Sequence, residues 1–359
     1  MTPSPVVEAL LVVLAGVMAA WVVSYLLHST LLCGAAWLLN RARAIAATDR
    51  ARLWRFVIVA PFVTATIQVT GLAGAPLVST DVARLLPQAL VDWRVGIVGA
   101  STLVVVVVTL AAGWIAGVCV LRRLLGRRRP APQALQHEVA MIAAVVGCRP
   151  PRVTLSDISP VPAAVGLSEV CVPAVSIDVM SPEQRRSLLA HEVGHLVARD
   201  PLWFAIAGTV CRAAAFQPLN RWAVSQLRIA SEEAADDFAA RATGDPTALA
   251  RALAGLATML FLLPGGVAAT GSPIVSRVSR LLDDDRPVPS PWRPSMRRFA
   301  ALIVIVLMVV AAPGLTASVD TVASRLPWLA PSRDEPSARM LEVRQFDRDL
   351  RDFFRRAFR

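Results

Sequence analysis

The sequence predicts a mainly α-helical membrane protein that also carries a folded α+β domain. Hydrophobic residues make up 55% of the 359 residues and charged residues only 18%, and the mean hydropathy is +0.55. A soluble protein contains more charge, and a disordered chain contains far less apolar surface. The hydrophobic residues also gather in long runs with arginine clusters beside them. This pattern is typical of helices that cross a bilayer.

Four runs are long enough to cross a membrane, because a spanning helix needs about 20 mostly apolar residues. They cover residues 6–39, 56–78, 95–121 and 299–317. The first run is too short for two spans and too long for one, so we expect a single tilted helix that projects beyond the bilayer. Only Glu8 and His28 interrupt it, and a break near Ser29 is the alternative. Because no basic segment precedes this run, we expect a retained anchor rather than a cleaved signal peptide.

The arginines predict the orientation, since basic residues collect on the cytoplasmic side of membrane helices. The chain contains no lysine, and arginine clusters follow the first span, follow the third span and precede the fourth: Arg41, Arg43, Arg50, Arg52 and Arg55; Arg122, Arg123, Arg127, Arg128 and Arg129; Arg293, Arg297 and Arg298. We therefore expect a multi-pass protein of the cell membrane, with both termini extracytoplasmic and residues 122–298 in the cytoplasm. Nucleic-acid binding would also suit a net charge of +11, but every cluster flanks a span, so we expect none.

The cytoplasmic segment, residues 122–298, is long enough to fold around a core of its own. It begins with a linker broken by Pro130 and Pro132, and a helix with apolar residues at helical spacing follows. Residues 152–179 are rich in β-branched residues and are punctuated by proline and glycine, so we expect a small β-sheet there. Helices are expected from there to about Leu282.

One helix of this segment carries a motif for metal-dependent chemistry. It is expected to begin at Ser181, because proline follows this cap and Gln184 can reach back to it. The motif H-E-V-G-H follows, with His191, Glu192 and His195. Histidines at i and i+4 lie on one helical face, so both imidazoles can bind one zinc ion. Glu192 is rotated by about 100° from His191, where its carboxylate can accept a proton from a metal-bound water.

A catalytic zinc ion needs a third protein ligand and leaves its fourth position to water. The next long helical stretch offers Glu232 with Asp236, and Glu233 with Asp237, and each pair shares a helical face at i, i+4. One pair can supply a ligand together with a carboxylate that orients a ligand histidine. Alanines surround both pairs, so periodicity leaves the choice between Glu232 and Glu233 open. A solvated acidic helix face is the alternative.

The H-E-x-x-H motif, the Arg-Asp pair after it and the E-x-x-A-D motif at 232–236 resemble the BlaR/MecR-type integral-membrane zinc metallopeptidases, and HtpX-type membrane proteases share the two-part motif. The resemblance covers about residues 1–298. It implies that Glu232 is the third ligand in a gluzincin-like site with one Zn2+ per chain, and that Asp236 orients a ligand histidine. The implied fold is mainly α, with four transmembrane helices and a cytoplasmic α+β zincin-like metallopeptidase domain that carries a small β-sheet.

Other segments resemble landmarks of the same family. Ala163, Ala164, Val165 and Gly166 resemble its edge strand, which would bind the substrate backbone by strand addition. Residues 217–220 and 277–282 also look like family landmarks.

The chain departs from the antibiotic receptors of this family after the fourth span. Those receptors carry a penicillin-binding domain there with a Ser-x-x-Lys nucleophile motif, whereas here residues 318–359 follow and the chain has no lysine. We therefore expect no β-lactam acylation of this chain. Apolar residues recur every three or four positions between 343 and 354, which predicts an extracytoplasmic amphipathic helix. It is expected to lie on the outer membrane surface, against a partner, or on the protein's own outer loop.

These observations predict a membrane-embedded zinc endopeptidase that cleaves a cytosolic protein at the membrane face, with Glu192 as general base. The resemblance implies that the substrate is a transcriptional repressor and that cleavage transduces a signal. The alternatives are an HtpX-like quality-control protease of membrane proteins and a catalytically inactive membrane scaffold. The expected partners are the protein substrate and membrane lipids.

Overall fold

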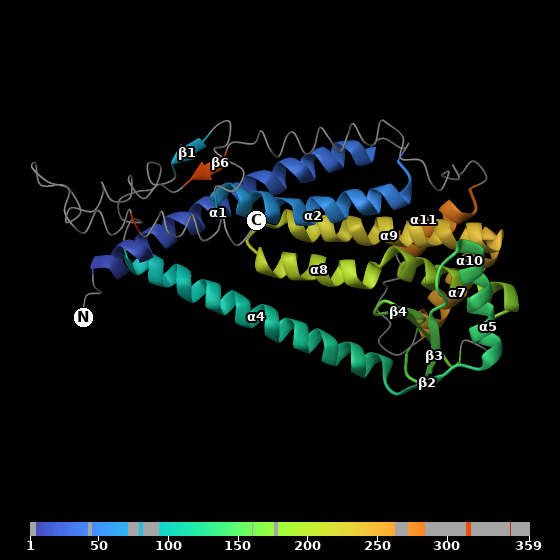
Figure 1. Cartoon of the computed structure of the whole chain (residues 1–359). Coiled ribbons are helices and arrows are strands. Elements are labelled where there is room, and N and C mark those ends of the chain that lie inside the picture. The colour runs from blue at the N-terminus through green and yellow to red at the C-terminus, as the bar shows by residue number, and fades with distance from the viewer. Residues whose placement is uncertain are drawn as a thin grey trace, which may run out of the picture.

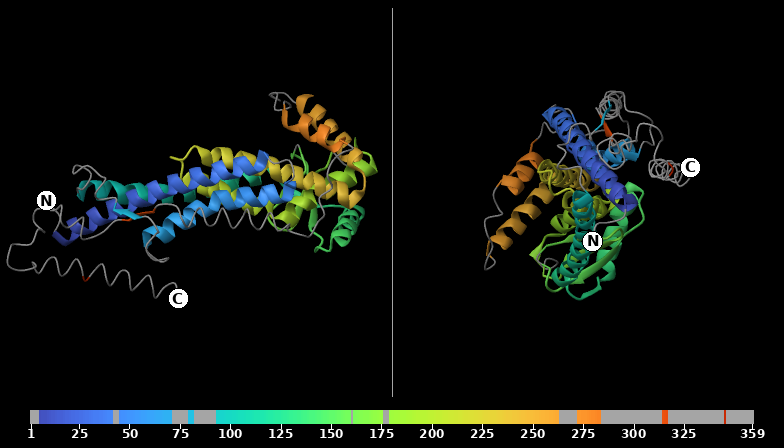
Figure 2. Two further views of the ribbon diagram at one scale, coloured as in Figure 1. Left: turned by 90° about the horizontal axis from the view of Figure 1, so that it is seen from above. Right: turned by 90° about the vertical axis from the view of Figure 1, so that its left-hand side faces the viewer.

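The computed structural model describes residues 5–41, 45–70, 79–81, 93–159, 161–175, 179–262, 272–283, 314–316 and 345. Within this part of the chain the protein is mostly helical and contains a small mixed sheet. The body is elongated, with long helices towards one end and the sheet with shorter helices at the other (Figure 1, Figure 2).

Three long apolar helices form the first half of the molecule. They are α1 (Pro5–Arg41), α2 (Ala47–Thr70) and α4 (Trp93–Leu125). In the described part of the chain, three stretches of these helices are long and apolar enough to cross a membrane: Leu14–Arg41, Ala47–Val69 and Ile97–Leu125. α1 is one continuous helix that passes Ser29 without a break. The expectation of a membrane protein with transmembrane helices is confirmed.

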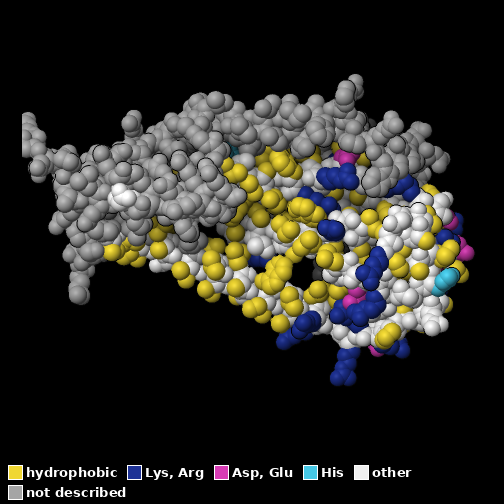
Figure 3. All heavy atoms as spheres, in the orientation of Figure 1, with side chains coloured by type: hydrophobic (Ala, Val, Ile, Leu, Met, Phe, Trp, Pro, Cys, Tyr) yellow, Lys and Arg dark blue, Asp and Glu magenta, His cyan; other side chains and the backbone are white. Residues whose placement is uncertain are grey.

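The α4 helix presents an apolar surface to its surroundings. None of its most hydrophobic window is buried inside the protein, and Trp114 and Ile115 are among its exposed side chains. Figure 3 shows hydrophobic side chains along α4, with arginines near the end where the helix meets the sheet. A hydrophobic face of this size suits contact with lipid rather than with water.

Two of the predicted spans are described only in part. Residues 71–78 of the second span lie outside the described residues, and α2 begins at Ala47, before the predicted start of that span. Of the fourth span, 299–317, the structure describes Gly314–Thr316, which forms strand β6. This strand differs from the helix expected there, and the helix-breaking pair Pro313-Gly314 gives a physical reason.

Strand β6 pairs in parallel with β1 (Ser79–Asp81). The amphipathic helix predicted between 343 and 354 lies outside the described residues, apart from residue 345.

A four-stranded mixed sheet lies at the other end of the molecule. Its strands run in the order β2-β3-β5-β4 and are β2 (Arg128–Pro130), β3 (Arg152–Ser156), β4 (Ala163–Val165) and β5 (Glu169–Pro173). β3 and β5 are parallel, and β2 and β4 pair antiparallel to them at the two edges. The expectation of a small sheet is confirmed. β2 lies where the sequence predicts a linker, and a proline is tolerated in it because the strand is at an edge.

Helices pack on this sheet and continue towards the long helices. They are α5 (Gln133–Val146), α7 (Pro182–Ala198), α8 (Asp200–Ala213), α9 (Leu219–Thr243), α10 (Pro246–Leu262) and α11 (Ser272–Leu281). Their shared apolar core includes Val139 and Ile142 of α5, Val170 of β5, and Leu189 and Val193 of α7. Full burial of one such side chain stabilises a fold by roughly 1.5–3 kcal/mol.

The α8 helix and the first part of α9 form a hairpin that lies alongside α1 and α2 (Figure 1). Trp222 of α9 packs edge-on against Trp54 of α2, with 5.0 Å between ring centroids. Residues 122–298 are the segment that the sequence predicts to be a cytoplasmic domain. Within this segment, α8 and the first part of α9 pack against the candidate membrane helices. The many apolar side chains of α8 make this packing favourable.

Polar contacts hold the tip of this hairpin against α1. The Asn220 side chain accepts a hydrogen bond from the Tyr25 hydroxyl (3.1 Å), and Gln217 donates one to the Ser29 hydroxyl (2.6 Å). All four residues are buried. Among apolar helices such bonds are favoured, because the alternative is an unsatisfied polar group. They join the sheet-bearing half to the long helices.

Candidate metal centre

The candidate site begins with helix α7, whose start is fixed locally. The Ser181 hydroxyl accepts a hydrogen bond from the backbone N–H of Gln184, and the Gln184 side chain accepts one from the backbone N–H of Ser181. This capping box confirms the predicted start of the helix. α7 then runs through His191 and His195 without a break, so both imidazoles lie on one face about a turn apart.

Helices α7 and α9 approach each other closely at Gly194. A Cβ atom added at Gly194 would lie 3.1 Å from Cδ1 of Phe238 on α9. This is closer than ordinary van der Waals contact, so a larger residue would push the two helices apart. The close approach brings the carboxylates of α9 within reach of the two histidines.

His191, His195 and Glu232 bring their ligand atoms together. Nε2 of His191 lies 3.1 Å from Nε2 of His195, and the Glu232 oxygens lie 3.5 Å and 3.7 Å from these two nitrogens. One donor atom from each residue lies within 4.8 Å of the others. Both histidines are buried, whereas the Glu232 side chain is 38% exposed. Glu232 is therefore the member of the group that is most exposed to solvent.

The structure separates the two glutamates between which periodicity could not choose. Glu233 forms an ion pair with Arg50 of α2, and the neighbouring Asp237 pairs with Arg280 of α11 at 2.9 Å. Neither carboxylate belongs to the group of donor atoms that gathers around the histidines. Glu232 is the one that lies beside the histidines, as the resemblance implies.

Asp236 and Arg277 support the His191 side of the group. Asp236 is fully buried, with Oδ1 3.1 Å from His191 Nδ1, and Arg277 donates hydrogen bonds to both of its oxygens. Burial raises the pKa of Asp236, but hydrogen bonds from His191 and Arg277 outweigh it and hold that pKa below its ordinary value. Burial also raises the pKa of Glu232, yet His191, His195 and Arg277 lower it to about 2. Both groups are thus carboxylates at neutral pH, as cation binding requires.

Asp200 supports the His195 side. One of its oxygens lies 2.7 Å from His195 Nδ1, and the other accepts hydrogen bonds from Arg55 (2.5 Å) and Ser231 (3.1 Å). Asp200 lies directly after a sharp turn at Arg199, which joins α7 to α8 with φ 57°, a left-handed conformation uncommon for a residue with a side chain. Asp200 entered the sequence argument only through the resemblance, without a role. An acidic residue at the end of the histidine-bearing helix is the local signal that could have assigned one.

The donor set fits a metal ion. Two imidazoles and one carboxylate form a known set of ligands for catalytic zinc, with the fourth position left to water. Each histidine presents Nε2 to the group, while its Nδ1 faces a buried carboxylate of Asp236 or Asp200. Such carboxylates fix the tautomer and orientation of a ligand histidine. Glu192 is buried on the same helix and interacts electrostatically with His191.

The residues expected to bind substrate form an edge strand beside α7. Ala163–Val165 is strand β4, which pairs with β5 at the end of the sheet order and contacts α7. Gly166 follows directly, with φ 60°, in the turn towards β5. An edge strand has backbone groups free for another strand to pair with.

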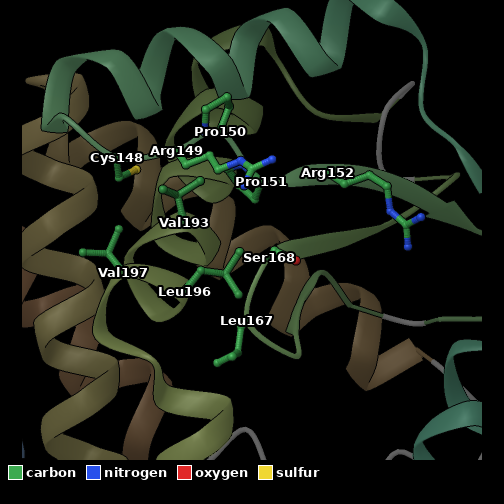
Figure 4. Close-up of a pocket in the computed structure, with 10 residues that line it drawn as sticks. All are labelled: Cys148, Arg149, Pro150, Pro151, Arg152, Leu167, Ser168, Val193, Leu196 and Val197. Carbon is green, nitrogen blue, oxygen red and sulfur yellow. The ribbon is translucent and has the colours of Figure 1, made fainter.

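A separate cavity lies on the opposite face of α7. Its volume is about 440 Å3, and its wall includes Val193, Leu196 and Val197 (Figure 4). These residues are rotated away from the histidine face by helical periodicity. The lining also includes Arg152, whose side chain extends away from the other labelled residues in Figure 4. The cavity therefore contains none of the groups that converge at the histidines.

Apolar helices long enough to span a membrane, joined to a buried pair of histidines with a glutamate, define a membrane metallopeptidase by class. A family model described as BlaR1 peptidase M56 matches residues 6–243, which run from α1 to the end of α9. The chain belongs to this family, and the resemblance seen in the sequence is confirmed. No curated protein matches the chain.

Proposed function

We propose that the protein is a zinc endopeptidase in which His191, His195 and Glu232 hold the metal ion. The observation that carries the proposal is the convergence of three donor atoms within 4.8 Å, in a chain of a metallopeptidase family. Two nitrogen donors favour zinc over magnesium or calcium, which prefer oxygen ligands. One zinc ion per chain is expected, because the three residues form a single group.

The bound zinc ion would lower the pKa of a water molecule and polarise the scissile carbonyl. The chain's own residues supply the remaining steps. Glu192 accepts the proton of the attacking water. Its carboxylate lies between the two ligand histidines in the sequence, directly after His191. Asp236 and Asp200 hold the histidine Nδ1 atoms, so that the Nε2 atoms stay directed at the metal.

The substrate backbone binds along β4 by adding a strand to the edge of the sheet. Ala163 and Ala164 carry small side chains, which leave room for the side chains of a bound peptide. Contact between β4 and α7 then brings the bound peptide to the helix that carries Glu192. Gly166, in the turn after β4, completes this binding segment.

The substrate is a cytosolic protein, a transcriptional repressor, and its cleavage transduces a signal across the cell membrane. The support is the position of the site at the arginine-bearing end of α4, which ends with Arg122 and Arg123 (Figure 1, Figure 3). Basic residues favour the cytoplasmic side, so the site faces the cytoplasm and both termini face outwards.

A second candidate is an HtpX-like quality-control protease of membrane proteins. It is favoured by the packing of the α8–α9 hairpin against α1 and α2, which sets the site directly beside candidate membrane helices. The third candidate is a catalytically inactive scaffold. It is disfavoured by the buried Glu192 beside the histidines, because a protein that only binds a partner does not need a general base.

The test compares cells that express the wild-type protein with cells that express Glu192→Gln, by proteome-wide mapping of new N-termini. New termini in a DNA-binding repressor, absent with Glu192→Gln, are the expected result. New termini in membrane proteins would favour the second candidate. Identical termini in both cells would favour the scaffold and overturn the proposal.

A further inference from the structure

An arginine of a candidate membrane helix contacts Asp200, the carboxylate beside His195. Arg55 lies on α2, within the candidate span Ala47–Val69. Its Nη2 donates a hydrogen bond to Oδ1 of Asp200 at 2.5 Å, and the two side chains are 13% and 2% exposed. Removing one partner of a charged pair this well shielded from water has a much larger effect than breaking a surface ion pair.

The other oxygen of Asp200 faces the metal group. Oδ2 lies 2.7 Å from Nδ1 of His195, while the Ser231 hydroxyl donates to Oδ1 at 3.1 Å. The carboxylate therefore has partners on α2, α7 and α9 at the same time. With Nδ1 of His195 bonded to this carboxylate, its Nε2 is the nitrogen directed at His191 and Glu232.

A second arginine of α2 makes a parallel contact. Arg50 pairs with Glu233, which is adjacent in sequence to the ligand Glu232. Between Arg50 and Arg55, Trp54 is buried and packs against Trp222 of α9. α2 is thus fixed to the elements that carry or support two of the three ligands.

We infer that Arg55 is a positioning residue for the metal ligand His195, and that the placement of α2 in the membrane thereby sets the metal affinity of the site. The inference rests on the proposed metal site and adds its regulation. N–H···O hydrogen bonds have donor–acceptor distances up to about 3.2 Å, so a shift of α2 by roughly one ångström is enough to loosen the bond from Arg55 to Asp200. His195 then loses the restraint on its ring.

The direct test measures zinc affinity in the full-length protein, by competition with a chelator, for Arg55→Gln, Arg55→Lys and Arg52→Gln. Arg52 is the matched control, because it lies on the same helix, is 73% exposed and bonds only its neighbour Asp49 in the described part of the chain. We expect Arg55→Gln to weaken zinc binding by roughly 10- to 100-fold, as loss of an outer partner does. Arg55→Lys should recover part of this loss, and Arg52→Gln should match the wild type.

A cobalt-substituted sample gives a readout that a purely structural role would not change. The visible absorption of Co2+ reports ligand geometry, so the spectrum should change with Arg55→Gln and not with Arg52→Gln. In the Asp200→Asn background, Arg55→Gln should have no further effect on either measurement. An additive loss of affinity in that background would show that Arg55 acts through overall folding, and would overturn the inference.

The role of α2 is tested by reconstituting the wild-type protein in short-chain and long-chain phosphatidylcholine bilayers, which change helix tilt. Zinc affinity should differ between the two bilayers in the wild type and not in Arg55→Gln. Equal affinities in the wild type would overturn the coupling. If instead His195→Ala retains zinc, the proposed metal site itself fails, whereas zinc loss with His195→Ala but not with Arg55→Gln removes this inference alone.

Discussion

Arg277 donates two hydrogen bonds to the buried carboxylate of Asp236, from Nε at 2.9 Å and from Nη2 at 2.7 Å. Its Nη1 also lies 2.8 Å from an oxygen of Glu232. One guanidinium on α11 therefore contacts both the candidate ligand from α9 and the carboxylate beside His191. This contact ties a helix outside the matched family range to the metal group.

Replacing Arg277 with alanine should destabilise the protein and weaken zinc binding together. The substitution leaves Asp236 buried without the guanidinium that donates two hydrogen bonds to it, and only the more distant Arg280 (3.9 Å) remains as an arginine partner in the described part of the chain. Breaking a buried pair in this way costs about 3–5 kcal/mol. Thermal unfolding and zinc content of purified protein check both effects. The exposed Arg251 is the control, and Arg251→Ala should leave both values unchanged. Equal behaviour of the two variants would contradict the role given to Arg277.

The metal ligands should differ sharply from their neighbours. We expect about one zinc ion per wild-type chain, loss of zinc with His191→Ala or His195→Ala, and clear weakening with Glu232→Ala. Glu233→Ala should retain zinc, because Glu233 pairs with Arg50 instead. Elemental analysis of dialysed protein measures this. Zinc loss with Glu233→Ala but not with Glu232→Ala would show that the third ligand is misassigned.

Glu192→Gln should keep zinc and fold but abolish proteolysis. The amide has nearly the same shape as the carboxylate, yet it cannot accept a proton from the attacking water. The expected loss is at least roughly 100-fold, within the range of general-base catalysis. Zinc analysis and a cleavage assay on the same sample separate the two functions. Cleavage at the wild-type rate would remove the role of Glu192.

The sheet should carry a measurable acid sensitivity at Glu169. Its carboxylate accepts hydrogen bonds from Thr154 (2.7 Å) and Arg152 (2.8 Å). Burial raises the pKa of Glu169, but these bonds and Arg128 hold it below its ordinary value. A lowered folded-state pKa stabilises the fold above the ordinary pKa, and this stabilisation is lost as pH falls through the folded value. From about pH 5 downwards, the melting temperature of the wild type should therefore fall faster than that of Glu169→Gln; parallel curves would contradict this.

The orientation of the chain is testable with reporter fusions. Fusions after Arg129 and Met296 should report the cytoplasm, and fusions after Thr80 and Ser332 should report the outside. The reason is the excess of arginine on one side, since an arginine placed across the bilayer costs a few kcal/mol. If the fusion after Arg129 reports the outside, the candidate site faces away from the cytosol and a cytosolic repressor cannot be its substrate.

The two histidines could be predicted from the sequence because their relationship is local. The i, i+4 spacing and the capping box at Ser181 need only one helix, and the structure has that helix. Glu232 is different, because its alanine-rich surroundings give no periodic signal. Its place beside His191 depends on the crossing of two helices at Gly194, and the sequence alone distinguishes it from Glu233 only through the family resemblance.

The contacts that complete the site join residues far apart in the sequence, so no local sequence pattern could predict them. Arg55 lies 145 positions from Asp200, and Arg277 lies 41 positions from Asp236. The packing of α8 and α9 against the membrane helices is equally hard to predict, because α8 is too short to span a bilayer and α9 carries too many charged residues. Strand β2 was missed because three residues ending in proline carry no strand pattern of their own.

The bonds from Tyr25 to Asn220 and from Gln217 to Ser29 bear on the order in which the protein folds during synthesis. The α1 helix leaves the ribosome long before α8 and α9 do, so the hairpin has its docking surface ready only after the first helices are inserted in the bilayer. The Glu232 carboxylate lies on the same helix as Asn220 and reaches the histidines when that helix is in place. We therefore expect a chain that fails to insert to lack the surface on which the first part of α9 packs, and so to hold Glu232 less firmly beside the histidines. Insertion of α1 and α2 is thus expected to come before completion of the candidate metal group.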